Sequence, residues 1–160
     1  SSGDQSNKVT IVAGTGSAGS SAAMLCDPLG IFVTSSLDLY VADCGNDRIQ
    51  LFRLGQINAT TVVGRGSNST MMIGCPYGIT FDADGNLFIV SSYQYHVIVV
   101  GPEGVGRCIV GCNATSGSAA NQLRNPSTLA FDIEGNLFVG DFGNGRIQKF
   151  QLIGRNRCSE

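Results

Sequence analysis

Three segments of this chain repeat one pattern of residues at nearly constant spacing. Each segment has a proline-led apolar stretch, a second apolar stretch, and then a polar turn followed by a basic residue. The prolines are Pro28, Pro76 and Pro126, which are 48 (76 − 28) and 50 (126 − 76) residues apart. The basic residues Arg48, His96 and Arg146 keep the same two spacings. A period in this range indicates a repeat architecture in which each unit packs on its neighbours.

Each repeat contains four short segments that are rich in valine, isoleucine, phenylalanine and tyrosine, as strands are. In the second repeat they are Gly78–Phe81, Leu87–Val90, Val97–Val100 and Arg107–Val110. Glycine and asparagine between the first two segments favour a tight hairpin. No segment has a sustained helical period. The sequence therefore predicts an all-β protein built from β-propeller blades of four antiparallel strands, with three blades' worth in this chain.

The repeat boundaries are staggered by one strand. Val9–Val12 matches the fourth strands of the first two repeats, and the third repeat lacks a fourth strand. We expect one repeat-built segment over residues 1–160, divided into 1–25 (the fourth strand and loop of a preceding blade), 26–74, 75–124 and 125–160. Propellers close with about 4–8 blades, so the chain is expected either to belong to a longer protein or to assemble from several copies.

The three segments resemble NHL repeats. The resemblance rests on Pro76–Ile79 with Asp82–Phe88, on Leu39–Asp43 with Gly45–Gln50, and on Asp132–Phe138 with Gly143–Phe150. The second repeat departs from the pattern, because Ser91, Gln94 and His96 replace the usual Asp, Asn and Arg. The resemblance implies a propeller that binds proteins, glycans or RNA, since only a few related propellers are enzymes.

Composition and sequence motifs narrow the choice of partners and of compartment. The net charge is −2 and no long basic cluster is present, which disfavours nucleic acid as a partner. No apolar run approaches the length of a membrane span, so no membrane insertion is expected. Three N-glycosylation sequons begin at Asn58, Asn68 and Asn113. Together with six cysteines, they predict an extracellular or secreted protein.

The cysteines have no zinc-ligand spacing, so disulfides are favoured over a metal site. Antiparallel strand order brings Cys44, Cys75 and Cys26 to the same end of the blades. Cys44–Cys75 is the favoured pair, and Cys44–Cys26 is the rival. Cys108 and Cys112 can pair only if the chain bends at Gly111. Cys158 lies 50 residues after Cys108, and a Cys26–Cys158 bond could lock a junction between copies.

Residues that break the repeat are the candidates for binding. Tyr93, Gln94 and Tyr95 replace the glycine–asparagine turn of the other repeats, and two aromatic rings there could stack on a sugar or anchor a partner. The alternative is a repacked turn. His96 is the only histidine; it is expected to serve the fold, and arginine is expected to be tolerated there. No catalytic residue, metal site or cofactor is predicted.

Together these features predict a non-enzymatic, glycosylated scaffold or adhesion module. Its N-terminal strand, Val9–Val12, is expected to complete the third blade of another copy, which gives a multimer or a filament. The expected partners are therefore further copies or other blades, with glycans and extracellular proteins as further possibilities. The alternatives are a lectin-like or protein-binding propeller and, less favoured, a lyase-like enzyme.

Overall fold

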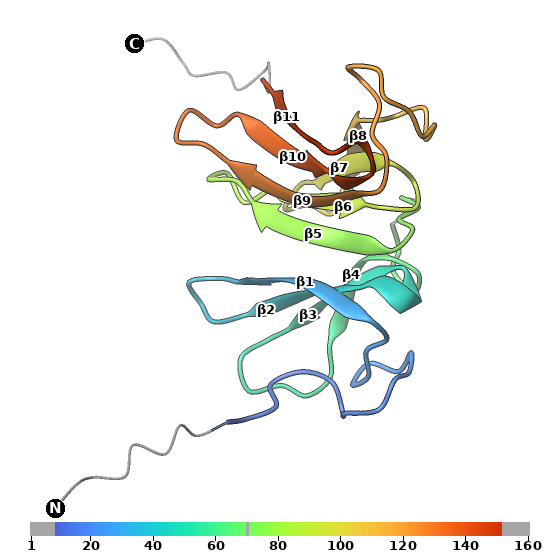
Figure 1. Ribbon diagram of the computed structural model, residues 1–160. Helices are drawn as coiled ribbons and strands as arrows, with labels where there is room; N and C mark the ends of the chain where they lie inside the picture. The colour runs from blue at the N-terminus through green and yellow to red at the C-terminus, as the bar shows by residue number, and fades with distance from the viewer. Residues whose placement is uncertain (1–8, 70, 152–160) are drawn as a thin grey trace, which may run out of the picture.

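The computed structural model describes residues 9–69 and 71–151 and contains three antiparallel sheets, which are three blades stacked side by side (Figure 1). Blade 1 consists of β1 (Pro28–Val33), β2 (Leu39–Asp43), β3 (Arg48–Phe52) and β4 (Thr60–Gly64). Blade 2 consists of β5 (Pro76–Phe81), β6 (Leu87–Ser91), β7 (His96–Val100) and β8 (Gly106–Val110). Blade 3 consists of β9 (Pro126–Phe131), β10 (Leu137–Asp141) and β11 (Arg146–Phe150). The all-β fold and the blade architecture predicted from the repeats are confirmed.

Short turns fix the register inside each blade. Between β5 and β6 the Asp82 carboxylate accepts hydrogen bonds from the backbone N–H groups of Asp84 and Asn86. Gly85 takes a φ of 81° in this turn, which glycine adopts without steric cost. Short 3-10 turns, η1 (Cys44–Asn46) and η2 (Phe142–Asn144), join the second and third strands of blades 1 and 3.

Two hydrophobic cores lie between the blades. The core between blades 1 and 2 includes Ala42 and Ile49 from blade 1 and Ile79 and Ile89 from blade 2. The core between blades 2 and 3 includes Phe88, Val90 and Val97 from blade 2 with Leu129 and Val139 from blade 3. Because side chains alternate along a strand, each inner strand contributes to both neighbours. Stability therefore depends on blade-to-blade contact, as in other repeat proteins.

The first strands β1, β5 and β9 lie next to one another along one side of the stack (Figure 1). They approach closely through glycine. A Cβ at Gly30 would overlap the carbonyl oxygen of Tyr77, and one at Gly78 would lie 2.9 Å from the carbonyl oxygen of Ser127. In blade 3 the equivalent residue is Thr128, which is exposed.

The predicted strand at Val9–Val12 is not formed within the chain. The described chain begins beyond blade 1 and ends in blade 3, at opposite ends of the stack (Figure 1). The segment is therefore far from β11, which is the strand that lacks a fourth-strand neighbour in the described residues. The ends of the expected division, residues 1–8 and 152–160, lie outside the described residues.

Candidate interaction site at the open ends of the blade stack

The outer face of blade 1 exposes residues that the other blades bury. Ile31 in β1 is equivalent to Ile79 in β5 and Leu129 in β9. Ile79 and Leu129 are only 8% exposed because blades 1 and 2 cover them, whereas Ile31 is 64% exposed. Leu29 and Val33 of the same strand are also exposed. This face has the composition of a blade-to-blade core without a covering blade.

The outer face of blade 3 also exposes an apolar residue whose counterparts are buried inside the stack. Ile147 in β11 is equivalent to Ile49 and Val97, which are fully buried in the two cores, yet Ile147 is 68% exposed. Phe142 in η2 occupies the position that Cys44 has in blade 1, and it is exposed as well. The two ends of the stack therefore present apolar surface of the kind that joins the blades internally.

The N-terminal segment adds a third exposed apolar element. Val9, Ile11 and Val12 are each at least 69% exposed. The glycine that follows, Gly14, has a φ of 78°, close to the φ of 95° at Gly64, the last residue of β4. The segment thus ends in the same left-handed conformation as a fourth strand without being paired as one.

A buried ion pair ties the loop after this segment to blade 1. Arg48 Nε donates to Asp43 Oδ2 over 2.7 Å, and both side chains are buried. Asn46 donates to Asp43 Oδ2 and to the carbonyl of Gly19. The remaining guanidinium N–H groups donate to the carbonyl oxygens of Ser20, Ser21 and Met24. The network satisfies a buried charge, as burial requires, and fixes the loop against the blade.

Blade 3 repeats this network. Arg146 Nε donates to Asp141 Oδ2 over 2.8 Å, and Asn144 donates to the same carboxylate and to the carbonyl of Gly117. Burial raises the pKa of Asp141, but hydrogen bonds from Asn144, the Arg124 backbone, Arg146 and Gln148 outweigh it and hold the pKa below its usual value. Recurrence of the network in two blades assigns it to the fold.

Blade 2 replaces the ion pair with neutral groups. Ser91 Oγ accepts from the backbone N–H of Gly74 and donates to its carbonyl. His96 is buried, and its Nε2 atom has no hydrogen-bond partner among the described residues. Burial lowers the pKa of His96. The histidine therefore stands in the arginine position as a neutral, packed side chain.

The predicted binding turn separates its two aromatic residues. Tyr93 is exposed, whereas Tyr95 is half-buried with a φ of 54°. Asp47 and Gly145 take nearly the same φ at the equivalent positions, so Tyr95 follows the backbone of the repeat. Gln94 lies against Gly74, where an added Cβ would be 3.2 Å from its amide nitrogen. Only Tyr93 offers a free ring.

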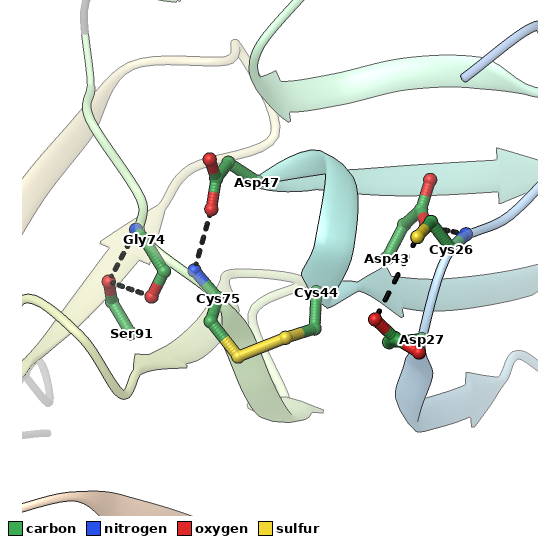
Figure 2. Close-up of a disulfide and its surroundings, with 8 residues drawn as sticks. All are labelled: Cys26, Asp27, Asp43, Cys44, Asp47, Gly74, Cys75 and Ser91. Atoms are coloured by element: carbon green, nitrogen blue, oxygen red, sulfur yellow. Dashed lines mark hydrogen bonds between the residues drawn. A yellow bond between two sulfur atoms is a disulfide. The ribbon is translucent and has the colours of Figure 1, made fainter. Parts of the chain in front are cut away.

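Two disulfides are present in the described residues. Cys44–Cys75 joins η1 of blade 1 to the start of blade 2 (Figure 2). Cys108–Cys112 closes a short loop after β8, and the required bend occurs at Gly111, whose φ is 69°. The rival pair Cys44–Cys26 does not form. Disulfides of this kind are typical of an oxidising compartment.

Cys26 is a free thiol beside Asp43 and Asp27 (Figure 2). Its backbone N–H donates to Asp43 Oδ1. Burial, aided by the Asp27 and Asp43 carboxylates, raises the pKa of the thiol, which lowers its reactivity at neutral pH. Cys158, the predicted partner across a junction, lies outside the described residues.

The remaining predicted sites are surface positions. Asn58, Asn68 and Asn113 are exposed in loops, and Thr70 of the second sequon lies outside the described residues. Within residues 9–69 and 71–151, no group of three His, Cys, Asp or Glu side chains is placed to hold a metal ion. The same residues include no helix with the length and apolarity to cross a membrane.

Sequence inspection alone missed the apolar end faces. Ile31 and Ile147 look like ordinary core residues of their strands, and each has a buried counterpart in both other repeats. Their exposure depends on which blade covers each strand in the folded structure, and that is not visible in the residues of the repeat itself.

The model of the NHL repeat matches residues 25–52. None of the curated proteins matches this sequence. A solved structure of a protein of unknown function from Bacteroides thetaiotaomicron matches with a TM-score of 0.72 and 16% identity, over 91% of this chain and 40% of that one. A putative gluconolactonase matches with a TM-score of 0.64 and 18% identity, over 80% and 46%. Virginiamycin B lyase from Staphylococcus aureus matches with a TM-score of 0.54 and 12% identity, over 79% and 42%.

These structures correct the prediction that the chain is not an enzyme. That prediction is wrong as a conclusion from the fold, because two structures that share the fold carry the names of enzymes. At 18% identity or less, the likeness concerns the fold alone and assigns no reaction to this chain. The chain also spans less than half the length of each of these structures.

The NHL-repeat match at residues 25–52 and the stacked antiparallel sheets together show that the chain contains an NHL repeat and has the fold of β-propeller blades.

Proposed function

We propose that this chain is a secreted, glycosylated scaffold module that assembles end to end with further copies of itself through strand complementation. The observation that carries the proposal is the contrast in exposure between equivalent residues. Ile31 and Ile147 are exposed at the two ends of the stack, while their counterparts within the stack are buried. An exposed apolar face of this kind marks an interaction surface.

The open edge of β11 supports strand complementation as the mode of contact. In the described residues β11 pairs only with β10, whereas β3 and β7 each pair on both sides. Natural proteins cover or pair such edges. An added strand brings main-chain hydrogen bonds as well as apolar contacts.

The first strand of blade 3 also favours β11 as the main contact. Gly30 and Gly78 allow the next blade to approach closely, but Thr128 stands at this position in blade 3. Its side chain lies over Gly140, where an added Cβ would be 2.7 Å from the threonine methyl group. A blade docking on blade 3 must therefore stay further away at the first strand, so the junction depends more on β11.

The disulfides and the sequons support secretion and glycosylation. Cys44–Cys75 and Cys108–Cys112 require an oxidising environment to persist. Asn58, Asn68 and Asn113 are exposed on loops and accessible to a glycosyltransferase. Expression through a secretory pathway should give a chain that loses mass on treatment with an N-glycosidase, and an unmodified chain would contradict this part of the proposal.

The native mass of the chain tests the assembly. The purified chain should sediment as multiples of 16.7 kDa, and dilution should shift it toward the monomer. An Ile147→Ser variant should shift toward monomer at the same concentration, because it removes apolar surface from the junction. Ile133→Ser is the matched control, since Ile133 is fully exposed in the β9–β10 turn. A monodisperse monomer at every concentration would overturn the proposal.

A ligand-binding function at Tyr93 is a second candidate. Tyr93 is 69% exposed at the end of blade 2, and an exposed aromatic ring is a common contact for sugars and protein partners. A glycan array with the chain and a Tyr93→Ala variant tests it. Binding that the variant loses would favour a lectin-like role over a purely structural one.

A further inference from the structure

We propose that residues 9–13 of one copy add to β11 of the next copy in one defined register, with Gly14 seated against the backbone of Gly145 and Arg146. This inference rests on the proposed end-to-end assembly and specifies its contact. The donated strand would take the fourth place in blade 3 and would turn the three-stranded sheet into a four-stranded one.

The register follows from the two complete blades. In blade 1, Ile49 pairs with Val63, Gln50 with Thr61 and Leu51 with Thr60. In blade 2, Val97 pairs with Val110, Ile98 with Cys108 and Val99 with Arg107. Both sheets skip one residue of the fourth strand at the same place. Transferred to blade 3, this shared pattern pairs Ile147 with Ala13, Gln148 with Ile11 and Lys149 with Thr10.

A glycine marks the end of the fourth strand in both complete blades. Gly64 and Gly111 have positive φ values, and a Cβ on either would overlap the carbonyl oxygen of Asp47 or Tyr95, respectively. The same Cβ would lie 2.9 Å from Arg48 Cα or 3.1 Å from His96 Cα. These glycines are therefore needed for close approach to the start of the third strand as well as for their conformation.

Gly14 has the conformation without the contact. Its φ is 78°, but the nearest atoms to an added Cβ belong to the side chain of Leu25, at 3.5 Å or more. The backbone atoms that would face it by equivalence are the Gly145 carbonyl oxygen and Arg146 Cα. Within one chain these lie at the opposite end of the stack (Figure 1), so a second copy must supply them.

The loop after the segment is already held in its final place. Arg48 and Asn46 bind the carbonyl groups of residues 19–24, just as Arg146 and Asn144 bind residues 117–122 after β8. Residues 9–13 therefore lead into the loop on blade 1 in the same way that β8 leads into the equivalent loop on blade 3. This pre-organisation reduces the entropic cost of docking.

Two glycine variants test the inference with a matched control. Gly14→Ala and Gly16→Ala carry the same conformational strain, because Gly16 has a φ of 84° and nothing lies within 4 Å of an added Cβ. Only Gly14 is expected to contact the partner's backbone. Analytical ultracentrifugation should show that Gly14→Ala raises the dissociation constant about tenfold or more relative to Gly16→Ala.

Cysteine cross-linking tests the register directly. A Thr10→Cys chain is mixed with a Lys149→Cys chain, and peptide mass spectrometry identifies disulfides between the two introduced cysteines. Such a bond can form only between copies, and it should be more abundant than the bond in a Thr10→Cys and Ile147→Cys mixture, which is two residues out of register.

The outcomes separate this inference from the proposal on which it rests. A chain that stays monomeric overturns both. Assembly in which Gly14→Ala behaves like Gly16→Ala, or in which the in-register cross-link is no more abundant than the out-of-register one, overturns the strand register alone. In that case the copies associate through their apolar faces by another route.

Discussion

At the scale of single residues, the three blades fill one pair of buried polar positions in two ways. Blades 1 and 3 bury an aspartate with an arginine, at 2.7 and 2.8 Å. Blade 2 places Ser91 and His96 at the same positions and so avoids a buried charge. The sequence shows that His96 corresponds to the two arginines. The cost of replacing His96 by arginine depends on Ser91, which lies opposite His96 on the neighbouring strand.

We expect His96→Arg to be destabilising by itself, in contrast to the tolerance inferred from the repeats. The guanidinium would enter a buried position where Ser91 replaces the carboxylate, and an unpaired buried charge costs about 3–5 kcal/mol. The Ser91→Asp, His96→Arg double variant should recover more than half of this loss. Urea unfolding of the wild type, both single variants and the double variant measures the coupling. Additive effects would show that the two positions do not interact.

The buried histidine should also make stability depend on pH. Burial lowers the pKa of His96 in the folded state, so protons bind the unfolded chain more readily. Stability is then fully present above the unfolded value of about 6.5 and declines as pH falls below it. Urea unfolding at several pH values should show a smaller decline for His96→Gln than for the wild type. Parallel declines would assign the effect to other groups.

At the scale of elements, the contact between first strands sets how tightly the blades pack. Neither Gly30 nor Gly78 has a positive φ, so an added methyl group causes no backbone strain there, and its destabilising effect comes from contact with the neighbouring blade. The close approach is tighter at Gly30, where the methyl group would overlap Tyr77, than at Gly78, where 2.9 Å remains to Ser127.

We expect Gly30→Ala to lower the free energy of unfolding by about 2–3 kcal/mol and Gly78→Ala by about 1 kcal/mol, the range found for overpacked interfaces. Thermal or urea unfolding of the two variants checks the order. Equal effects at Gly30 and Gly78 would show that the blades shift to accommodate either change.

Most strands could be predicted from the sequence, because proline, turn glycine and alternating apolar residues recur in each repeat. The segment Val9–Val12 is the exception: it has the sequence of a strand but no partner strand among residues 9–69 and 71–151. A strand forms only where another edge accepts its hydrogen bonds, and local sequence carries no information about that edge. Binding at the turn Tyr93–Tyr95 stays a prediction: Tyr93 is exposed, whereas Tyr95, which has the left-handed backbone of Asp47 and Gly145, is half-buried.

At the scale of the whole molecule, the described part of the chain has two inner cores and an uncovered outer face at each end of the stack. In repeat proteins each unit is stabilised by its neighbours, so the end blades lack part of the stabilisation that blade 2 receives from both sides. Covering the outer faces would add apolar burial at each end, and stability would then rise with protein concentration.

The Cys44–Cys75 bond has a mechanical consequence for such an assembly. Tension applied along an array would enter a copy near residue 9 and leave it at β11, so it would pull along the chain through all three blades. The disulfide spans 31 residues, which could otherwise extend by about 100 Å at roughly 3.3–3.6 Å per residue. While the bond is intact the residues between the two cysteines cannot extend, and blades 1 and 2 cannot be pulled apart at this point. Reduction would allow the same residues to extend under tension. The redox state of the Cys44–Cys75 bond would therefore set how far each copy can lengthen before the strands of the array separate.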